Sequence, residues 1–278
     1  MTILATRLAH AVRATGTPLC VGIDPWPERL PGEGPLADRA EDFGRAVVEA
    51  CAGVVPAVKP QFAFFEALGP AGMVALARTC AAARDAGLIV VGDAKRGDIG
   101  STAAAYAAAT LAPDAPFACD ALTVNPFLGP DTVAPFLEVA DAHGGGLFVL
   151  VRTSNPGSAR WQAPVVDDLA AWLTEQGATR TDAHGLSNLG AVVGATHPDA
   201  LARLRDQLPH AWLLVPGFGA QGASAADTRA AGRDDGLGAL VVSARAATFP
   251  AGGFSSRPTD DIRALVARAR DALSVGWR

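Results

Sequence analysis

Eight short apolar segments recur at regular distances along the chain. They cover residues 19–23, 54–58, 88–92, 121–124, 147–151, 190–193, 212–215 and 239–242. Because these segments are almost continuously apolar rather than alternating, they are typical of strands buried on both faces of a parallel sheet.

Segments with helical spacing lie between the apolar runs. The clearest are 40–51, 72–86, 131–143, 164–176, 198–207, 223–231 and 260–273, and the charge-poor segment 99–113 also reads as a packed helix. Eight strands that alternate with helices predict a single α/β domain over residues 1–278, a (β/α)8 TIM barrel with an extended loop region at about 155–186. An open, doubly wound sheet is the alternative, because alternation alone does not show that the sheet closes.

Composition and charge narrow the possible partners and the compartment. Of the 278 residues half are hydrophobic, which excludes intrinsic disorder, and 23 basic against 28 acidic residues give a net charge of −5, which argues against a nucleic-acid partner. A transmembrane helix needs an apolar run of about 18 residues, and no run in this sequence is that long, so no membrane partner is expected. Residues 1–16 show no secretory signal, and the four widely spaced cysteines predict reduced thiols and a cytoplasmic location.

A polar residue lies at the carboxyl end of each predicted strand or follows it. In chain order these residues include Asp24, Lys59, Asp93, Thr123, Arg152, Thr196, Gln221 and Arg245. Barrel enzymes build their active sites at this carboxyl face. Polar residues also resume wherever a strand ends, so a single case would mean little, but all eight strand ends show the pattern.

The segment Asp93-Ala-Lys95-Arg-Gly-Asp98 is the sharpest chemical signal. Residues i and i+2 of an extended strand end point to the same side, so we expect Asp93 and Lys95 to face the site together, whereas Asp98 follows a glycine and need not do so. A lysine held between carboxylates stays protonated and can deliver a proton. Lys59 is expected to pair with Asp93, because a buried lysine seldom lacks a partner. The alternative is a surface salt-bridge cluster.

Residues 217–222 (GFGAQG) match the Gly-x-Gly-x-x-Gly pattern after a strand. The next strand ends in Ser-Ala-Arg245 rather than in an acidic residue, so a dinucleotide site is disfavoured and a phosphate site that includes Arg245 is predicted. The five histidines show no paired spacing typical of zinc ligands. Spacing alone leaves a carboxylate-bound Mg²⁺ open.

These segments together resemble orotidine 5′-phosphate decarboxylase. The resemblance rests on the Asp93–Asp98 motif followed by Ile, on Lys59 one strand earlier, on Thr-Ser154-Asn-Pro-Gly after the fifth strand, and on Val-Pro216-Gly-Phe-Gly-Ala-Gln-Gly after the seventh. The length and the Thr-Val-Asn-Pro-Phe segment at 123–127 suggest the longer bacterial subgroup of that family. The resemblance implies a cytoplasmic lyase that converts orotidine 5′-phosphate to UMP in de novo pyrimidine synthesis, with no metal and no other cofactor.

The resemblance also implies roles for the charged residues. Lys95 would protonate C6 as CO₂ leaves, Asp93 would lie against the substrate carboxylate, and Lys59 would complete the charged chain. Asp98 and Thr102 would enter the site of the neighbouring subunit, so a homodimer is expected. Whether Asp93 repels the substrate carboxylate or positions Lys95 stays open.

Substrate binding is implied for a larger set of positions. Asp24 and Lys59 would hold ribose hydroxyls and Ser154 the pyrimidine edge, while Gln221 and Arg245 would hold the phosphate under a closing loop at 216–222. The full predicted binding set is Asp24, Lys59, Thr102, Thr123, Asn125, Ser154, Pro216, Gly219, Gln221, Gly222 and Arg245.

Two other functions compete with this prediction. A Mg²⁺-dependent sugar-phosphate decarboxylase or aldolase of the same superfamily would carry a carboxylate at the end of the second strand, where this chain has Lys59. A non-catalytic barrel that binds a phosphate ligand would not need a protonating lysine. Both alternatives are therefore disfavoured.

Overall fold

Eight parallel strands form a closed barrel in the computed structural model, which describes residues 2–196, 198–219 and 222–277. Each strand pairs with the next, and β8 pairs with β1. The strands are β1 (Leu19–Ile23), β2 (Ala57–Pro60), β3 (Ile89–Arg96), β4 (Ala121–Val124), β5 (Gly146–Arg152), β6 (Ser187–Val193), β7 (Ala211–Pro216) and β8 (Ala239–Ser243). The predicted (β/α)8 barrel is confirmed, and the open sheet is excluded by the pairing of β8 with β1.

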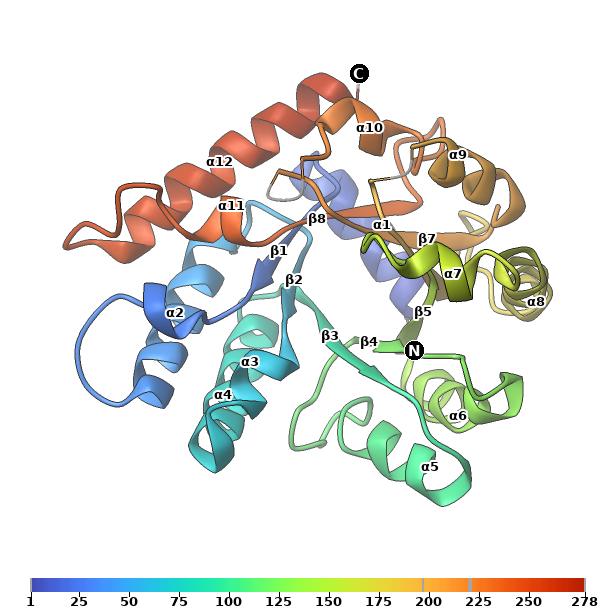
Figure 1. Ribbon diagram of the computed structural model, residues 1–278, viewed down its shortest axis with the longest axis horizontal. Coiled ribbons are helices and arrows are strands. Elements are labelled where there is room, and N and C mark those ends of the chain that lie inside the picture. Colours follow the sequence, from blue (N-terminus) through green and yellow to red (C-terminus); the bar gives the residue numbers. More distant parts are fainter. Residues whose placement is uncertain (1, 197, 220–221, 278) are drawn as a thin grey trace.

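Helices surround the barrel on its outside, and one more helix lies across its amino-terminal end (Figure 1). They are α1 (Leu4–Thr15), α2 (Leu36–Cys51), α3 (Phe62–Glu66), α4 (Gly69–Asp85), α5 (Gly100–Ala108), α6 (Ala134–His143), α7 (Ser158–Gln162), α8 (Val166–Ala178), α9 (Pro198–Gln207), α10 (Ala225–Arg229), α11 (Arg245–Thr248) and α12 (Pro258–Gly276), with 3-10 turns η1 (Pro27–Arg29) and η2 (Pro130–Thr132). In the described part of the chain, no helix combines the length and the apolar character needed to cross a membrane.

The second and third strands reach further toward their carboxyl ends than the apolar pattern predicts. β2 ends at Pro60 rather than at residue 58, and β3 ends at Arg96 rather than at residue 92. Strand pairing continues there, since Lys59 is in register with Gly22 of β1. The apolar pattern stops earlier because Lys59, Asp93 and Lys95, near the ends of these strands, line a polar cavity rather than a core.

The amino-terminal end of the barrel is covered by α1, which the apolar pattern did not predict. Its residues Leu4, Leu8 and Val12 pack in one cluster with inward-facing strand residues such as Phe148 and Trp212. Figure 1 shows α1 behind the strands, at the centre of the ring of helices. The barrel interior is therefore a packed core at this end, and the opposite end is left for the site.

The region 155–186 contains two helices. The short α7 follows β5 at the carboxyl face of the barrel, and α8 packs against β5 and β6. The predicted helix at 164–176 corresponds to α8. Position 162, at the end of α7, is a glutamine whose side chain returns to the segment after β5 and so connects this region to the site.

Candidate active site

A cavity of about 400 Å³ opens at the carboxyl ends of the strands. Its floor is formed by Val192, Leu214 and Val242, which belong to the packed interior of the barrel. Its walls contain most of the site residues predicted from the sequence, namely Asp24, Lys59, Asp93, Lys95, Thr123, Ser154, Pro216 and Arg245. The volume lies in the range of small-molecule sites.

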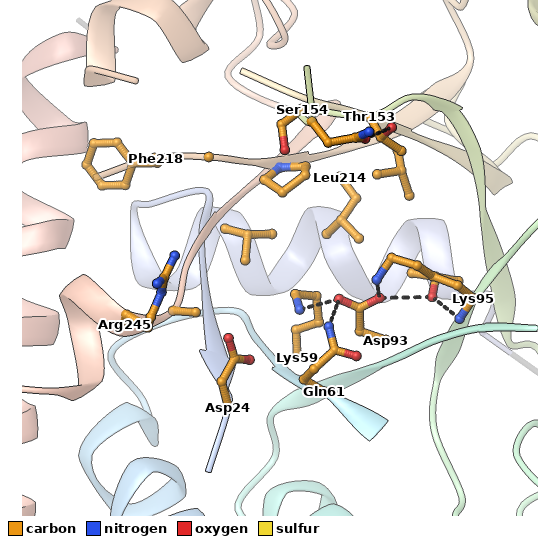
Figure 2. Close-up of a pocket in the computed structure, with 17 residues that line it drawn as sticks. Asp24, Lys59, Gln61, Asp93, Lys95, Thr153, Ser154, Leu214, Phe218 and Arg245 are labelled. Atoms are coloured by element: carbon orange, nitrogen blue, oxygen red, sulfur yellow. Dashed lines mark hydrogen bonds and ion pairs between the residues drawn. The ribbon is translucent and has the colours of Figure 1, made fainter. Parts of the chain in front are cut away.

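Asp93 is the centre of the polar network in this cavity (Figure 2). Its Oδ2 accepts hydrogen bonds from Lys59 Nζ at 2.6 Å and from Gln61 Nε2 at 2.8 Å. Its Oδ1 accepts from Lys95 Nζ and from Thr123 Oγ1, the latter at 3.2 Å. Asp93 and Lys59 are only 7% and 5% exposed, so the pair is a buried one and not the surface cluster that was the alternative.

The opposite charges keep this buried pair ionised. Burial alone would raise the pKa of the Asp93 carboxyl, but the charges of Lys59 and Lys95 outweigh burial and hold that pKa well below its usual value. Burial alone would lower the pKa of Lys59, but the charges of Asp93 and Asp24 raise it above its usual value. The Asp93 carboxylate and the Lys59 ammonium are therefore both charged at neutral pH.

Lys95 reaches Asp93 through an unusual backbone conformation. Its φ is 49°, and no other non-glycine residue in the described ranges has a positive φ. Thr123 Oγ1 supports this turn by accepting hydrogen bonds from the backbone N–H of Ala94 at 3.0 Å and of Lys95 at 2.9 Å. The side chains of Asp93 and Lys95 do meet, as expected, but a left-handed residue and not simple strand alternation brings them together. Such a conformation costs on the order of 1–3 kcal/mol and persists only where the surroundings hold it.

Asp24 and Arg245 form a second polar region of the cavity. Figure 2 shows Arg245 on the opposite side from Lys95, with Asp24 between them. The buried Asp24 Oδ1 has no hydrogen-bond partner among the described residues, and burial raises the pKa of this carboxyl. The Arg245 guanidinium lies over the Trp26 ring, 5.5 Å from its centroid. An unpaired acceptor and an exposed cation are suited to a ligand that carries hydroxyl groups and an anion.

The segment after β5 forms a further part of the cavity wall, drawn across the cavity from Lys59 and Gln61 in Figure 2. Thr153, Ser154 and Asn155 line the cavity there. Gln162 of α7 holds the segment, because its Oε1 accepts from the Thr153 backbone N–H and its Nε2 donates to Thr153 Oγ1, both at 2.8 Å. Thr153 Oγ1 in turn donates to Asn155 Oδ1 at 2.6 Å. The residues on both sides of Ser154 are therefore held by hydrogen bonds, which fixes the position of Ser154 in the cavity wall.

The glycine-rich segment after β7 turns sharply at the cavity edge. Gly217, Gly219 and Gly222 have φ values of 118°, 80° and 88°, a region that side chains rarely adopt. Pro216 and Gly217 line the cavity, whereas Gly219 and Gly222 do not. The predicted phosphate ligand Gln221 lies outside the described residues.

Three further predicted residues do not line the cavity of their own chain. Asp98 Oδ1 accepts a hydrogen bond from the backbone N–H of Ile99 at 2.8 Å, and Thr102 lies exposed on α5. Asn125 Oδ1 accepts from the Phe127 backbone N–H at 3.0 Å, so its side chain caps a turn. None of the three belongs to the cavity wall formed by the described residues.

The structure adds residues that were not predicted. Gln61, Thr153, Asn155 and Phe218 all line the cavity. The first three follow strand ends, which is the same position in the chain that indicated the charged site residues. They were not predicted because a neutral polar side chain at a strand end is hard to distinguish from an ordinary loop residue. Across residues 2–196, 198–219 and 222–277, no three His, Cys, Asp or Glu side chains are grouped in a way that could hold a metal ion.

Comparison with known proteins places this site in a family. Residues 17–248 match the model of the orotidine 5′-phosphate decarboxylase / HUMPS family. The chain belongs to this family. A relative from Rhodopirellula baltica named orotidine 5′-phosphate decarboxylase is 49% identical, with 90% of this chain and 89% of the relative covered. One of the same name from a Nocardioides species is 42% identical over 95% of this chain and 96% of its own length.

Solved structures agree with this family. A candidate orotidine 5′-phosphate decarboxylase from Streptomyces avermitilis superposes with a TM-score of 0.87 at 38% identity, covering 100% of this chain and 96% of its own. The OMP decarboxylase of Leishmania donovani gives a TM-score of 0.73 at 32% identity, covering 96% of this chain and 98% of its own. The resemblance predicted from the sequence is thereby confirmed.

Proposed function

We propose that this protein decarboxylates orotidine 5′-phosphate to UMP, the last step of de novo pyrimidine synthesis. The buried group of Asp93, Lys59 and Lys95 is the observation that carries the proposal. Lys59 stands at the end of β2, where the Mg²⁺-dependent sugar-phosphate enzymes would need a carboxylate, and its Nζ is 2.6 Å from Asp93. A cation at this place favours the nucleotide substrate over a metal-bound sugar phosphate.

In the proposed reaction, the bond between C6 and the carboxylate breaks and CO₂ leaves. The electron pair of that bond stays on C6, and a proton from Lys95 Nζ completes UMP. A fixed ammonium stabilises the developing carbanion most effectively where water is excluded. Asp93 holds Lys95 by an ion pair and stands next to the place of the leaving carboxylate.

The remaining polar groups bind the substrate. Asp24 and Lys59 hold the ribose hydroxyls, since Asp24 Oδ1 is a buried acceptor that lacks a donor among the described residues. Ser154 binds the pyrimidine edge, and Arg245 with Gln221 binds the phosphate. Binding of a phosphate remote from C6 can drive closure of the segment 216–222 and offset the cost of bringing like charges together. Contacts of Thr123 and Asn125 with the substrate stay predictions.

The test is the loss of orotidine 5′-phosphate absorbance in the presence of EDTA. We expect turnover with EDTA, and about a 10³-fold or larger loss in Lys95→Met because the proton donor is gone. Arg78→Met is the matched control, because Arg78 lies on the surface of α4 in an exposed pair with Glu41. Absence of turnover in the wild type, or turnover only with added Mg²⁺, would refute the proposal.

We also propose a homodimer in which Asp98 and Thr102 complete the partner's site. Support comes from two exposed apolar side chains, Ile99 directly after Asp98 and Phe127 after β4, which are 63% and 80% exposed and favour burial against another surface. Lys95→Ala and Asp98→Ala homodimers should each be nearly inactive, and their heterodimers should regain one intact site. If heterodimers form and stay inactive, Asp98 serves its own chain.

A cytoplasmic location fits the cysteines. Cys20, Cys51, Cys80 and Cys119 are all free and buried, as expected in a reducing compartment. Mass spectrometry of alkylated protein from fractionated cells would test this location.

A further inference from the structure

Gln61 is a polar residue of the cavity that the proposed reaction does not use. It directly follows β2, and its backbone N–H donates to the Ile23 carbonyl at 3.0 Å. It also forms an isolated parallel bridge with Asp93. The backbone of Gln61 is therefore fixed beside that of Asp93, and its side chain lies in the cavity (Figure 2).

The contact between Gln61 and Asp93 defines which end of the amide faces the carboxylate. The two side chains approach to 2.8 Å at Asp93 Oδ2. An ionised carboxylate only accepts hydrogen bonds, so the amide must present its NH₂ group there. The amide oxygen of Gln61 is then turned away from Asp93.

The four donors around Asp93 saturate its carboxylate. Oδ2 receives Lys59 and Gln61, and Oδ1 receives Lys95 and Thr123. Two donors on each oxygen fix the carboxylate plane as well as its position, because each oxygen offers about two lone-pair directions. Without Gln61, Oδ2 would keep only the Lys59 ammonium as a donor, and the carboxylate plane would be less constrained.

We propose that Gln61 is a positioning residue for the decarboxylation, acting through Asp93. This inference rests on the proposed function. By fixing the plane of the carboxylate, Gln61 keeps Oδ1 directed at the Lys95 ammonium and so keeps the proton donor in place. An amide does this without adding a charge, whereas a third cation beside Asp93 would attract the substrate carboxylate and hold it in the ground state.

The variants Gln61→Met and Gln61→Glu separate positioning from simple structural support. Gln61→Met removes the donor at similar length, and we expect kcat to fall about 10- to 100-fold, the effect of one hydrogen bond to a charged group, with KM changed less than about threefold. Gln207→Met, in which a glutamine at the end of α9 is replaced, is the matched control and should leave both constants unchanged.

Gln61→Glu adds a pH-dependent readout. In this variant the protonated form of the introduced carboxyl group can donate to Asp93 as the amide does, but the ionised form repels Asp93. The activity of Gln61→Glu relative to wild type should therefore be highest at acidic pH and fall as the pH rises. The charged groups that face this position are Lys59 from β2, Asp93 and Lys95 from β3, Asp24 after β1 and Arg245 of α11, and all are unchanged in the variant.

Each outcome separates this inference from the proposed function. If the wild type does not turn over orotidine 5′-phosphate, the proposed function fails first. If the wild type is active and Gln61→Met keeps its kcat, or if Gln61→Glu has a wild-type pH profile, Gln61 does not position Asp93. A rise of KM with unchanged kcat would make Gln61 a substrate contact and also overturn the inference. Thermal denaturation of each variant shows whether it folds, and if Gln61→Met does not, the pH profile of Gln61→Glu decides alone.

Discussion

Replacing Lys59 with methionine tests the buried charges most directly. Methionine has a similar length but no charge, so Lys59→Met removes the ammonium that lies 2.6 Å from Asp93 Oδ2 and leaves the barrel wall filled. Asp93 then becomes a buried carboxylate that keeps Gln61, Thr123 and Lys95 as donors.

The expected loss of stability follows from this geometry. Removing one partner of a buried ion pair costs about 3–5 kcal/mol. Because three donors remain on Asp93, we expect the lower limit, about 3 kcal/mol, which for a chain of this size corresponds to a Tm lower by about 6–12 °C. Arg78→Met, which breaks the exposed pair with Glu41, should cost less than about 1 kcal/mol.

The pH dependence has a defined sign. The pKa of Asp93 is depressed in the folded protein, so its stabilising effect is present above the pKa of the unfolded carboxyl and is lost as the pH falls toward the folded value. The pKa of Lys59 is raised, so its effect is lost only at strongly basic pH. The advantage of wild type over Lys59→Met should therefore be constant between about pH 5 and 9 and decline below about pH 4.

Urea unfolding followed by tryptophan fluorescence measures these differences, with Trp212 in the barrel interior as one reporter. A double-mutant cycle with Asp93→Asn should show a coupling of about 2 kcal/mol, because the two changes remove the same interaction. The reasoning is refuted if Lys59→Met unfolds within about 0.5 kcal/mol of wild type, or if the two substitutions add without coupling.

Three further substitutions have expected outcomes. Thr123→Val removes the acceptor of two backbone N–H groups at the left-handed Lys95. We expect kcat to fall about tenfold or more and the free energy of unfolding to fall by about 1–3 kcal/mol, and Thr123→Ser should restore both. Unchanged kinetics in Thr123→Val would contradict this. Arg205→Met removes a buried guanidinium that donates to several backbone carbonyls, so urea unfolding should show a loss of about 3 kcal/mol with KM unchanged, and a neutral effect would contradict it. Gly190→Ala places a methyl group 2.6 Å from the Trp212 carbonyl oxygen. The free energy of unfolding should therefore fall by about 1–3 kcal/mol, which thermal denaturation would show as a lower Tm. A Tm equal to that of wild type would count against this.

The barrel could be predicted from the sequence because strands buried on both faces leave a clear apolar signal. The charged residues of the site could be predicted for the complementary reason, since Lys59 and Asp93 are buried charges that follow apolar runs. The helix α1 was not predicted because it precedes the first strand, whereas the predicted helices were recognised as the segments between strands.

Other features of the site depend on contacts that are distant in the chain. The left-handed backbone of Lys95 cannot be predicted from its residue type, because this conformation depends on a hydrogen bond to Thr123 in the next strand. Gln61 and Asn155 are neutral polar residues at strand ends and are hard to distinguish from ordinary loop residues. The proposed role of Asp98 in a partner's site rests on the family resemblance and not on contacts within one chain.

Lys59 and Lys95 are the only lysines in the sequence, and every other basic side chain apart from histidine is an arginine. Their side chains are 6% and 44% exposed, so the buried one is shielded and the other is open to reagents. Apart from the terminal amine, an amine-selective reagent therefore has one accessible target in this protein, and that target is the proposed proton donor. The chain can be labelled or crosslinked at the Lys95 nitrogen without engineering, and we expect UMP to protect that nitrogen.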